Sequence, residues 1–172
     1  MAIGKEMPEE VKTGTTTVAV ALKDSVVMGA ERRATMGYLI AHKATKKVFK
    51  IDDNLGMTIA GLVGDAQILV RYLRAEVELY RLKRGLPMSV QGASSLLANI
   101  LHGSRYYPYW VGLILGGLDS KGGQVFSLDA AGGSIPDDYV SVGSGSPFAY
   151  GVLEDGHSKD IRKEDAINLI IR

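Results

Sequence analysis

The spacing of apolar residues changes near Asp65, and that change constrains the fold more than any other feature. Before Asp65, short apolar segments separated by turn residues predict two β-hairpins, over 15–31 and 46–62. After it, apolar residues recur at helical spacing and predict two helices, over 66–84 and 89–103. Four strands are therefore expected before the first helix.

Residues that favour helix ends mark the boundaries of these two helices. Asp65 is predicted to be the N-cap of the first helix and Gly85 its C-cap. Ser89, two residues after Pro87, is at the expected start of the second helix. The segment from Arg32 to Gly37 lacks a strand pattern, so we expect a polar loop there.

The second half of the chain again places strands before helices. Strands are predicted over 109–117, 124–129 and 139–142, and helices over 147–153 and from residue 162. The first helix pair needs a sheet face on which to bury its apolar stripes, and the second pair can cover the opposite face of a two-sheet stack. This order predicts an α+β fold or a layered sandwich rather than the βαβ alternation of a doubly wound sheet.

Composition narrows the classes of function. With 172 residues, 46% hydrophobic and 23% charged, the chain matches one globular domain, and a net charge of +1 gives no reason to expect nucleic acid or a membrane as partner. The absence of Cys excludes disulfides and thiol catalysis, and the three His are too far apart to form a spaced set of metal ligands. The leader has no apolar signal segment and the apolar run at 110–118 is too short to span a bilayer, so we expect a cytoplasmic protein.

Gly14 and the three threonines after it form the candidate reactive segment. Gly14 suits a kinked peptide at the start of a strand. If the bond from Gly14 to Thr15 breaks, Thr15 carries a hydroxyl nucleophile and an α-amine whose ordinary pKa of about 7.7–8.0 suits a general base. Taken alone, Gly-Thr-Thr-Thr is more typical of a turn that enters a strand.

This segment is the first of five separated motifs. They are Gly14-Thr15-Thr16-Thr17-Val18, Glu31-Arg32-Arg33-Ala34-Thr35, Lys46-Lys47, Ala60-Gly61-Leu62-Val63-Gly64-Asp65 and Gly143-Ser144-Gly145-Ser146-Pro147. Together, and in this order, they resemble the β subunits of archaeal proteasome core particles. The resemblance implies an N-terminal nucleophile hydrolase fold, a four-layer α-β-β-α sandwich of two antiparallel sheets between helix layers. It also implies a propeptide, 1–14, removed by autocatalysis, and a peptidase domain, 15–172.

The resemblance assigns a catalytic role to five residues. Thr15 matches the catalytic threonine, Lys47 the active-site lysine, and Glu31 the acidic residue that pairs with it. Gly61 matches the glycine whose backbone N–H binds the oxyanion, and Ser144 a serine that supports the α-amine. The cleaved bond follows Gly14.

The resemblance also implies a substrate site. Thr35 resembles a main-chain substrate contact, and Ala34, Thr45, Ile59 and Val63 resemble the lining of the pocket for the residue before the cleaved bond. None of these pocket residues is charged, so we expect cleavage after apolar residues.

Each catalytic assignment has a physical reason and an ordinary alternative. The Lys47 cation lowers the pKa of a nearby amine, but most strand lysines are simply solvated. Glu31 orients Lys47, or else forms a weak surface ion pair. Gly61 lets an oxyanion approach the backbone, or ends a strand. Ser144 lies in a turn that is equally typical of a helix entry.

The sequence therefore predicts a threonine peptidase that hydrolyses peptide bonds of unfolded proteins without metal or cofactor. The resemblance implies heptameric rings of identical or similar β subunits, α-subunit rings that cap them, and an ATP-dependent unfoldase. Two alternatives stay open: an inactive structural ring subunit, and another N-terminal nucleophile hydrolase that acts on a small amide.

Two departures from the family pattern are expected to matter. Ser25 is at a hairpin position where the family usually has Gly, which costs up to about 1 kcal/mol if the site needs a positive φ. The sequence also ends before an Asp and a Ser-Gly pair that the family carries near the nucleophile. We therefore expect the domain to be incomplete at its C-terminus, and we expect the chain as it stands to be inactive and poorly soluble by itself.

Overall fold

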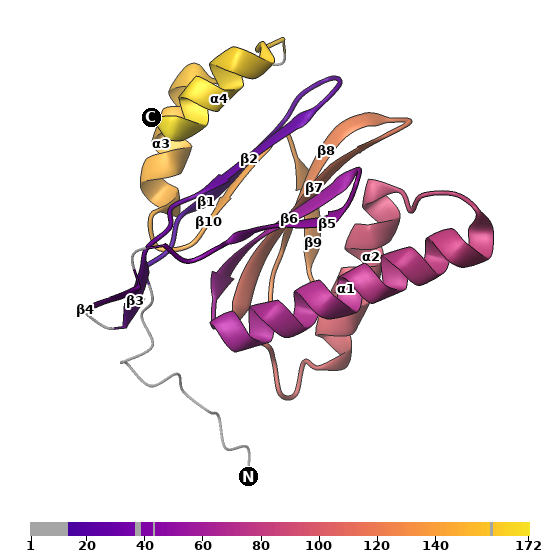
Figure 1. The fold of residues 1–172 in the computed structure, drawn as a ribbon. Coiled ribbons are helices and arrows are strands. Elements are labelled where there is room, and N and C mark those ends of the chain that lie inside the picture. The colour runs from indigo at the N-terminus through magenta and orange to yellow at the C-terminus, as the bar shows by residue number, and fades with distance from the viewer. Residues whose placement is uncertain (1–13, 37–38, 43, 159) are drawn as a thin grey trace.

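The chain folds into two antiparallel sheets stacked between two layers of helices (Figure 1). The computed structural model describes residues 14–172 except 37–38, 43 and 159. The larger sheet has the strand order β5 (Val48–Asp52), β6 (Leu55–Gly61), β7 (Val111–Asp119), β8 (Gly122–Leu128) and β9 (Ser134–Asp137). The smaller sheet has the order β10 (Tyr139–Val142), β1 (Thr17–Ala21) and β2 (Val26–Ala30).

Each sheet has its own pair of helices on its outer face. The helices α1 (Val63–Arg84) and α2 (Val90–Gly103) pack against the five-stranded sheet, and α3 (Ser146–Gly156) and α4 (Lys163–Ile171) pack against the three-stranded sheet (Figure 1). This arrangement confirms the predicted four-layer α-β-β-α sandwich. No helix in the described part of the chain is long and apolar enough to cross a membrane.

Alternation along the strands divides the core into three layers. On β6, Met57 and Ile59 face α1 and α2, where they pack with buried leucines of both helices. On β1, Val18 and Val20 face α3 and α4, whereas Ala19 lies between the sheets with Ile114, Val125 and Val140. Successive residues therefore point to opposite faces in both sheets, which separates two outer cores from a thin apolar layer between the sheets.

The ends of α1 and α2 agree with the sequence in three places and differ in one, and α3 continues three residues beyond its predicted end at residue 153. Gly85 has a left-handed φ of 70° and its N–H donates to the Arg81 carbonyl at 2.8 Å, as expected for a C-cap. Ser89 caps α2 by accepting from Gly92 N at 3.1 Å, and that helix ends at Gly103 as predicted. The prediction that Asp65 is an N-cap is wrong, because α1 begins two residues earlier and has Leu62 as N-cap.

Three strands were missed by the sequence pattern. The predicted polar loop from residue 32 to 37 contains β3 (Ala34–Met36), which pairs with β4 (Leu39–His42) in a separate two-stranded sheet. A three-residue strand is shorter than any apolar alternation that sequence can reveal. The third missed strand is β9, which contains Pro136 and pairs with β8 at the edge of the larger sheet. Proline in a strand is tolerated at such an edge.

The strain considered at Ser25 is absent. Among the described residues, every positive φ belongs to a glycine. Leu22 N–H donates to the Ser25 carbonyl at 2.8 Å, which closes the turn between β1 and β2 without a left-handed residue.

Candidate active site

The centre of the site is a contact between Thr15 and Lys47, which come from different sheets. Thr15 precedes β1 and Lys47 precedes β5. The two side chains meet because Lys47 Nζ donates to Thr15 Oγ1 at 3.0 Å. Both residues are buried, at 6% and 7% exposure. A lysine cation at such a site needs polar partners, so Lys47 is not an ordinary solvated strand lysine.

Two acceptors from the segment after β2 hold the Lys47 cation. Its Nζ forms an ion pair with Glu31 Oε1 and donates to the Arg33 carbonyl. The second carboxylate oxygen of Glu31 accepts from Arg33 N. The Lys47 ammonium therefore has three acceptors, which match its three N–H donors and fix its direction toward Thr15.

A glycine-rich turn between β10 and α3 encloses the backbone of Thr15. Thr15 N donates to Ser144 Oγ at 3.2 Å, and the Thr15 carbonyl accepts from Gly145 N at 3.3 Å. Gly143 has a φ of +112°, and a Cβ there would lie 2.1 Å from the Thr15 carbonyl oxygen. The turn therefore requires glycine at 143 to approach this backbone so closely. The sequence singled out the motif and Ser144, but it gave no reason for Gly143.

The threonines after Thr15 have separate structural roles. Thr16 is pressed against the same turn, since a Cβ on Gly145 would lie 2.0 Å from Thr16 Oγ1. Thr17 is fully buried, its Oγ1 donates to the Val142 carbonyl at 3.2 Å, and its carbonyl accepts from Ser141 Oγ at 2.9 Å. These bonds hold β1 against β10 two residues after Thr15.

Gly61 ends β6, on the sheet that supplies Lys47. Ile59 N–H donates to the Lys47 carbonyl at 3.0 Å, and Gly61 lies two residues further along the strand. Gly61 has a φ of +115°, and a Cβ there would lie 2.1 Å from the Trp110 carbonyl oxygen. The structure thus joins Thr15, Glu31, Lys47 and Ser144 by direct contacts and places Gly61 at the adjoining strand end.

The residues predicted to line the substrate pocket lie on several elements. Thr45 is half-buried and donates from its N–H to the Arg32 carbonyl at 2.7 Å. Ile59 is 5% exposed and packs in the core under α1 and α2, whereas Val63 begins α1 and is 45% exposed. Ala34 and Thr35 belong to β3, of which the structure describes only the backbone path.

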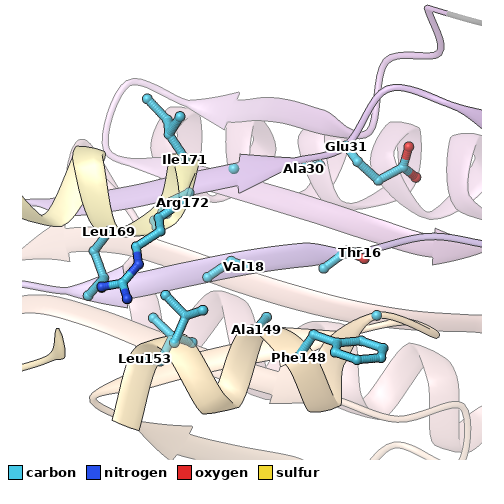
Figure 2. A pocket seen from close by; sticks show the side chains of 14 residues that line it. Thr16, Val18, Ala30, Glu31, Phe148, Ala149, Leu153, Leu169, Ile171 and Arg172 are labelled. Carbon is cyan, nitrogen blue, oxygen red and sulfur yellow. The ribbon is translucent and has the colours of Figure 1, made fainter. Parts of the chain in front are cut away.

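A concave region lies beside the candidate site, on the face of the three-stranded sheet that α3 and α4 cover. It is a cavity of about 510 Å³ between β1, β2, α3 and α4, with Thr16 just before β1 and Glu31 just after β2 (Figure 2). Most of its lining is apolar and includes Val18, Leu153 and Ile171. The sequence gave no signal for this cavity, because its walls are far apart along the chain. Among the described residues, no cluster of three or more His, Asp or Glu is arranged to hold a metal ion.

Comparison with known proteins gives one consistent result. The proteasome subunit family matches residues 11–172. The proteasome subunit beta of Methanothermobacter thermautotrophicus is 55% identical over 159 residues, which cover 92% of this chain and 76% of that protein. The proteasome subunit beta of Thermoplasma acidophilum is 54% identical over 166 residues, and that of Picrophilus torridus is 52% identical over 164 residues. These two alignments cover 96% and 95% of this chain, and 78% of each relative.

Proposed function

Because the chain belongs to the proteasome subunit family, we propose that it is a β subunit of the core particle and that Thr15 is the nucleophile of a threonine-type peptidase. The observation that carries this proposal is the bond from Lys47 Nζ to Thr15 Oγ1 at 3.0 Å, with Lys47 held in turn by Glu31. In covalent catalysis, the nucleophile typically contacts an activating group, and a third residue orients that group.

The free nucleophile is produced by cleavage between Gly14 and Thr15. In the chain described here, the Thr15 nitrogen that donates to Ser144 Oγ is the amide of that bond. Addition of the Thr15 hydroxyl to the Gly14 carbonyl converts the amide into an ester, and water then hydrolyses the ester. The nitrogen becomes an α-amine at the same place, and residues 1–14 leave as a propeptide.

In the mature subunit, Thr15 Oγ1 attacks the carbonyl carbon of a substrate peptide bond. Its proton passes to the α-amine through a water, while the Lys47 cation favours the negative charge that develops on the oxygen. The leaving amine takes a proton and departs, which leaves an ester between the substrate acyl group and Thr15. Water then hydrolyses that ester and restores the hydroxyl.

The developing oxyanion is stabilised by the backbone N–H of Gly61 in this proposal. Glycine is needed at 61 because the strand end has a positive φ and touches the Trp110 carbonyl. Removing one such donor typically costs about 2.7–4 kcal/mol of transition-state stabilisation.

The substrates and partners follow from the family. We propose cleavage of unfolded polypeptides after apolar residues, with Ala34, Thr45, Ile59 and Val63 around the side chain before the cleaved bond and Thr35 on the main chain. The subunits assemble into heptameric β rings that α-subunit rings cap, and an ATP-dependent unfoldase supplies substrate in the cytoplasm. A panel of fluorogenic peptides tests the preference, and faster cleavage after Arg or Asp than after Leu, Phe or Tyr contradicts the pocket.

N-terminal sequencing of active assembled particles tests the nucleophile. We expect Thr-Thr-Thr-Val, and we expect a peptide vinyl sulfone to label Thr15 and abolish hydrolysis. Active particles that retain residue 1 contradict the mechanism.

The same measurements separate the two alternatives. Assembled particles with an intact bond after Gly14 and no hydrolysis indicate a structural ring subunit. Activity of a monomer or dimer on an amino-acid amide indicates a different N-terminal nucleophile hydrolase. A Thr15→Ser variant is the matched control, since it keeps a hydroxyl nucleophile and should keep activity that Thr15→Ala loses.

A further inference from the structure

Asp65 makes a bond that its place in the helix does not require. It lies in the first turn of α1, where a carboxylate commonly serves the helix's own N-terminus. Its Oδ2 instead accepts from the backbone N–H of Trp110 at 2.8 Å. Trp110 directly precedes β7, forty-five positions away in the sequence. The carboxylate therefore links the start of helix α1 to the start of strand β7.

The Trp110 backbone is held on its other side as well. Its carbonyl accepts from Leu62 N at 2.9 Å. Leu62 is the N-cap of α1 and directly follows Gly61. Trp110 is thus fixed between two points of one helical turn, by Asp65 at its N–H and by Leu62 at its carbonyl.

Gly61 rests against this same carbonyl. A Cβ on Gly61 would lie 2.1 Å from the Trp110 oxygen and 3.0 Å from the Trp110 carbonyl carbon. The left-handed backbone of Gly61, with a φ of +115°, is therefore shaped by the position of the Trp110 carbonyl. A rotation of the Trp110 backbone removes both the wall beside Gly61 and the acceptor of Leu62 N–H.

We propose that Asp65 is a positioning residue for catalysis, and that it fixes the direction of the Gly61 peptide N–H by holding the backbone of Trp110. The inference rests on the proposed function, in which that N–H binds the oxyanion. Donors of this kind act only when they are preorganised toward the oxygen, and misplacement by about 1 Å can cost about 10²-fold in rate. Asp65 touches neither Thr15 nor Lys47 in any bond that the structure shows, so its effect passes through backbone alone.

Substitutions at Asp65 separate this role from an ordinary helix-end role. Asp65→Asn removes the negative charge, which a helix N-terminus favours, but keeps an oxygen that can accept from Trp110 N–H. Asp65→Glu keeps the charge but moves the carboxylate one carbon further away. Positioning predicts that Asn is tolerated and Glu is not, whereas stabilisation of the helix dipole predicts the reverse.

The experiment measures steady-state hydrolysis of a fluorogenic peptide by assembled, processed particles of each variant. We expect Asp65→Ala and Asp65→Glu to lower kcat by about 10- to 100-fold with KM changed by less than about threefold, and Asp65→Asn to stay within about threefold of wild type. Affinity for a peptide aldehyde, whose adduct carries the oxyanion, should fall by a similar factor. The rate of labelling by a peptide vinyl sulfone, which forms no tetrahedral oxyanion at a carbonyl, should be almost unchanged.

Asp165→Ala is the matched control, because Asp165 is also an acidic residue in the first turn of a helix and bonds Arg162 beside that turn. We expect wild-type kinetics for it. If Asp65→Ala does not assemble, the contrast between Asn and Glu decides the question.

Three results overturn the inference alone: wild-type kcat in Asp65→Ala, an Asn variant as impaired as Ala, or vinyl sulfone labelling that falls in proportion to hydrolysis. Wild-type particles that are neither labelled at Thr15 nor active refute the proposed function instead, and the inference falls with it.

Discussion

In the described part of the chain, the two halves of the sandwich differ in how closely their helices pack on their sheets. Under α1 and α2, Leu69, Leu73 and Leu97 are completely buried in a continuous core with the five-stranded sheet. The core under α3 and α4 is smaller, and a cavity of about 510 Å³ lies between these helices and β1 and β2. Thr15, the proposed nucleophile, belongs to this second half.

The two halves contribute different parts of the candidate site. The larger half supplies the strand ends that carry Lys47 and Gly61, while the smaller half supplies Thr15, Glu31 and the turn around Ser144. Rigid elements hold reactive groups more accurately than loops do. The comparison therefore predicts that changes in the larger half act mainly on stability, except at Lys47, whose side chain reaches Thr15, and at Gly61 and Asp65, which we propose bind and position the oxyanion.

The Lys47 side chain extends from the larger half to Thr15 in the smaller half, and its removal should have the largest effect on peptide hydrolysis. We expect Lys47→Ala to lower peptide hydrolysis by at least about 10³-fold while the subunit still folds, because Thr15 Oγ1 loses its cationic partner. Hydrolysis and far-ultraviolet circular dichroism of the purified variant measure the two effects.

Lys46→Ala is the control for that experiment. Lys46 is the exposed neighbour, and its Nζ lies 5.6 Å from the centre of the Phe49 ring. We expect near-normal turnover for it. Near-normal turnover in correctly assembled Lys47→Ala would mean that Lys47 has no catalytic role and that the two halves do not cooperate at Thr15.

A matched pair of core substitutions tests the difference in packing directly. Leu73 on α1 and Leu153 on α3 are both buried, at 0% and 1% exposure, but Leu153 also lines the cavity. We expect Leu73→Ala to cost about 3–5 kcal/mol of unfolding free energy and Leu153→Ala about 2–3 kcal/mol, because the space left by Leu153 opens into one that already exists. Urea unfolding of both variants measures the difference. Equal costs, or a larger cost at Leu153, would show that the two halves are packed alike.

Local pattern predicted the helix pairs and most strands of this fold, whereas the four-layer arrangement was implied by the resemblance. Apolar spacing predicted α1 and α2, and the chemistry of Gly85 and Ser89 placed their ends. It misplaced the start of α1, because Asp65 is engaged by a distant backbone N–H that no local rule reveals. The short strands β3 and β4 and the edge strand β9 gave too little pattern to be recognised.

The site was predictable only through the resemblance. Thr15 is separated from Lys47 by 32 positions and from Ser144 by 129, so no spacing rule joins them. Glu31 and Lys47 are individually ordinary residues of a charged surface until burial and a shared partner distinguish them. The cavity beside the site also depends on tertiary packing and had no counterpart in the sequence.

The smallest expected effect concerns a bond that fastens α3 to the smaller sheet. Tyr139 OH donates to Glu154 Oε1 at 2.6 Å, and this hydrogen bond, together with burial and the charge of Glu154, raises the pKa of Tyr139 to about 12. Because the folded pKa is higher than the ordinary value of about 10, the bond stabilises the fold fully below pH 10, and this contribution is lost as the pH rises toward 12. We therefore expect Tyr139→Phe to lower the urea midpoint slightly at pH 7 and by progressively less above pH 10. Tyr107→Phe, at a side chain 91% exposed, should leave the midpoint unchanged at both pH values. A Tyr139→Phe deficit that grows above pH 10 would show that the phenol of Tyr139 does not hold α3 on β10, and the looser half would then depend on apolar contacts alone.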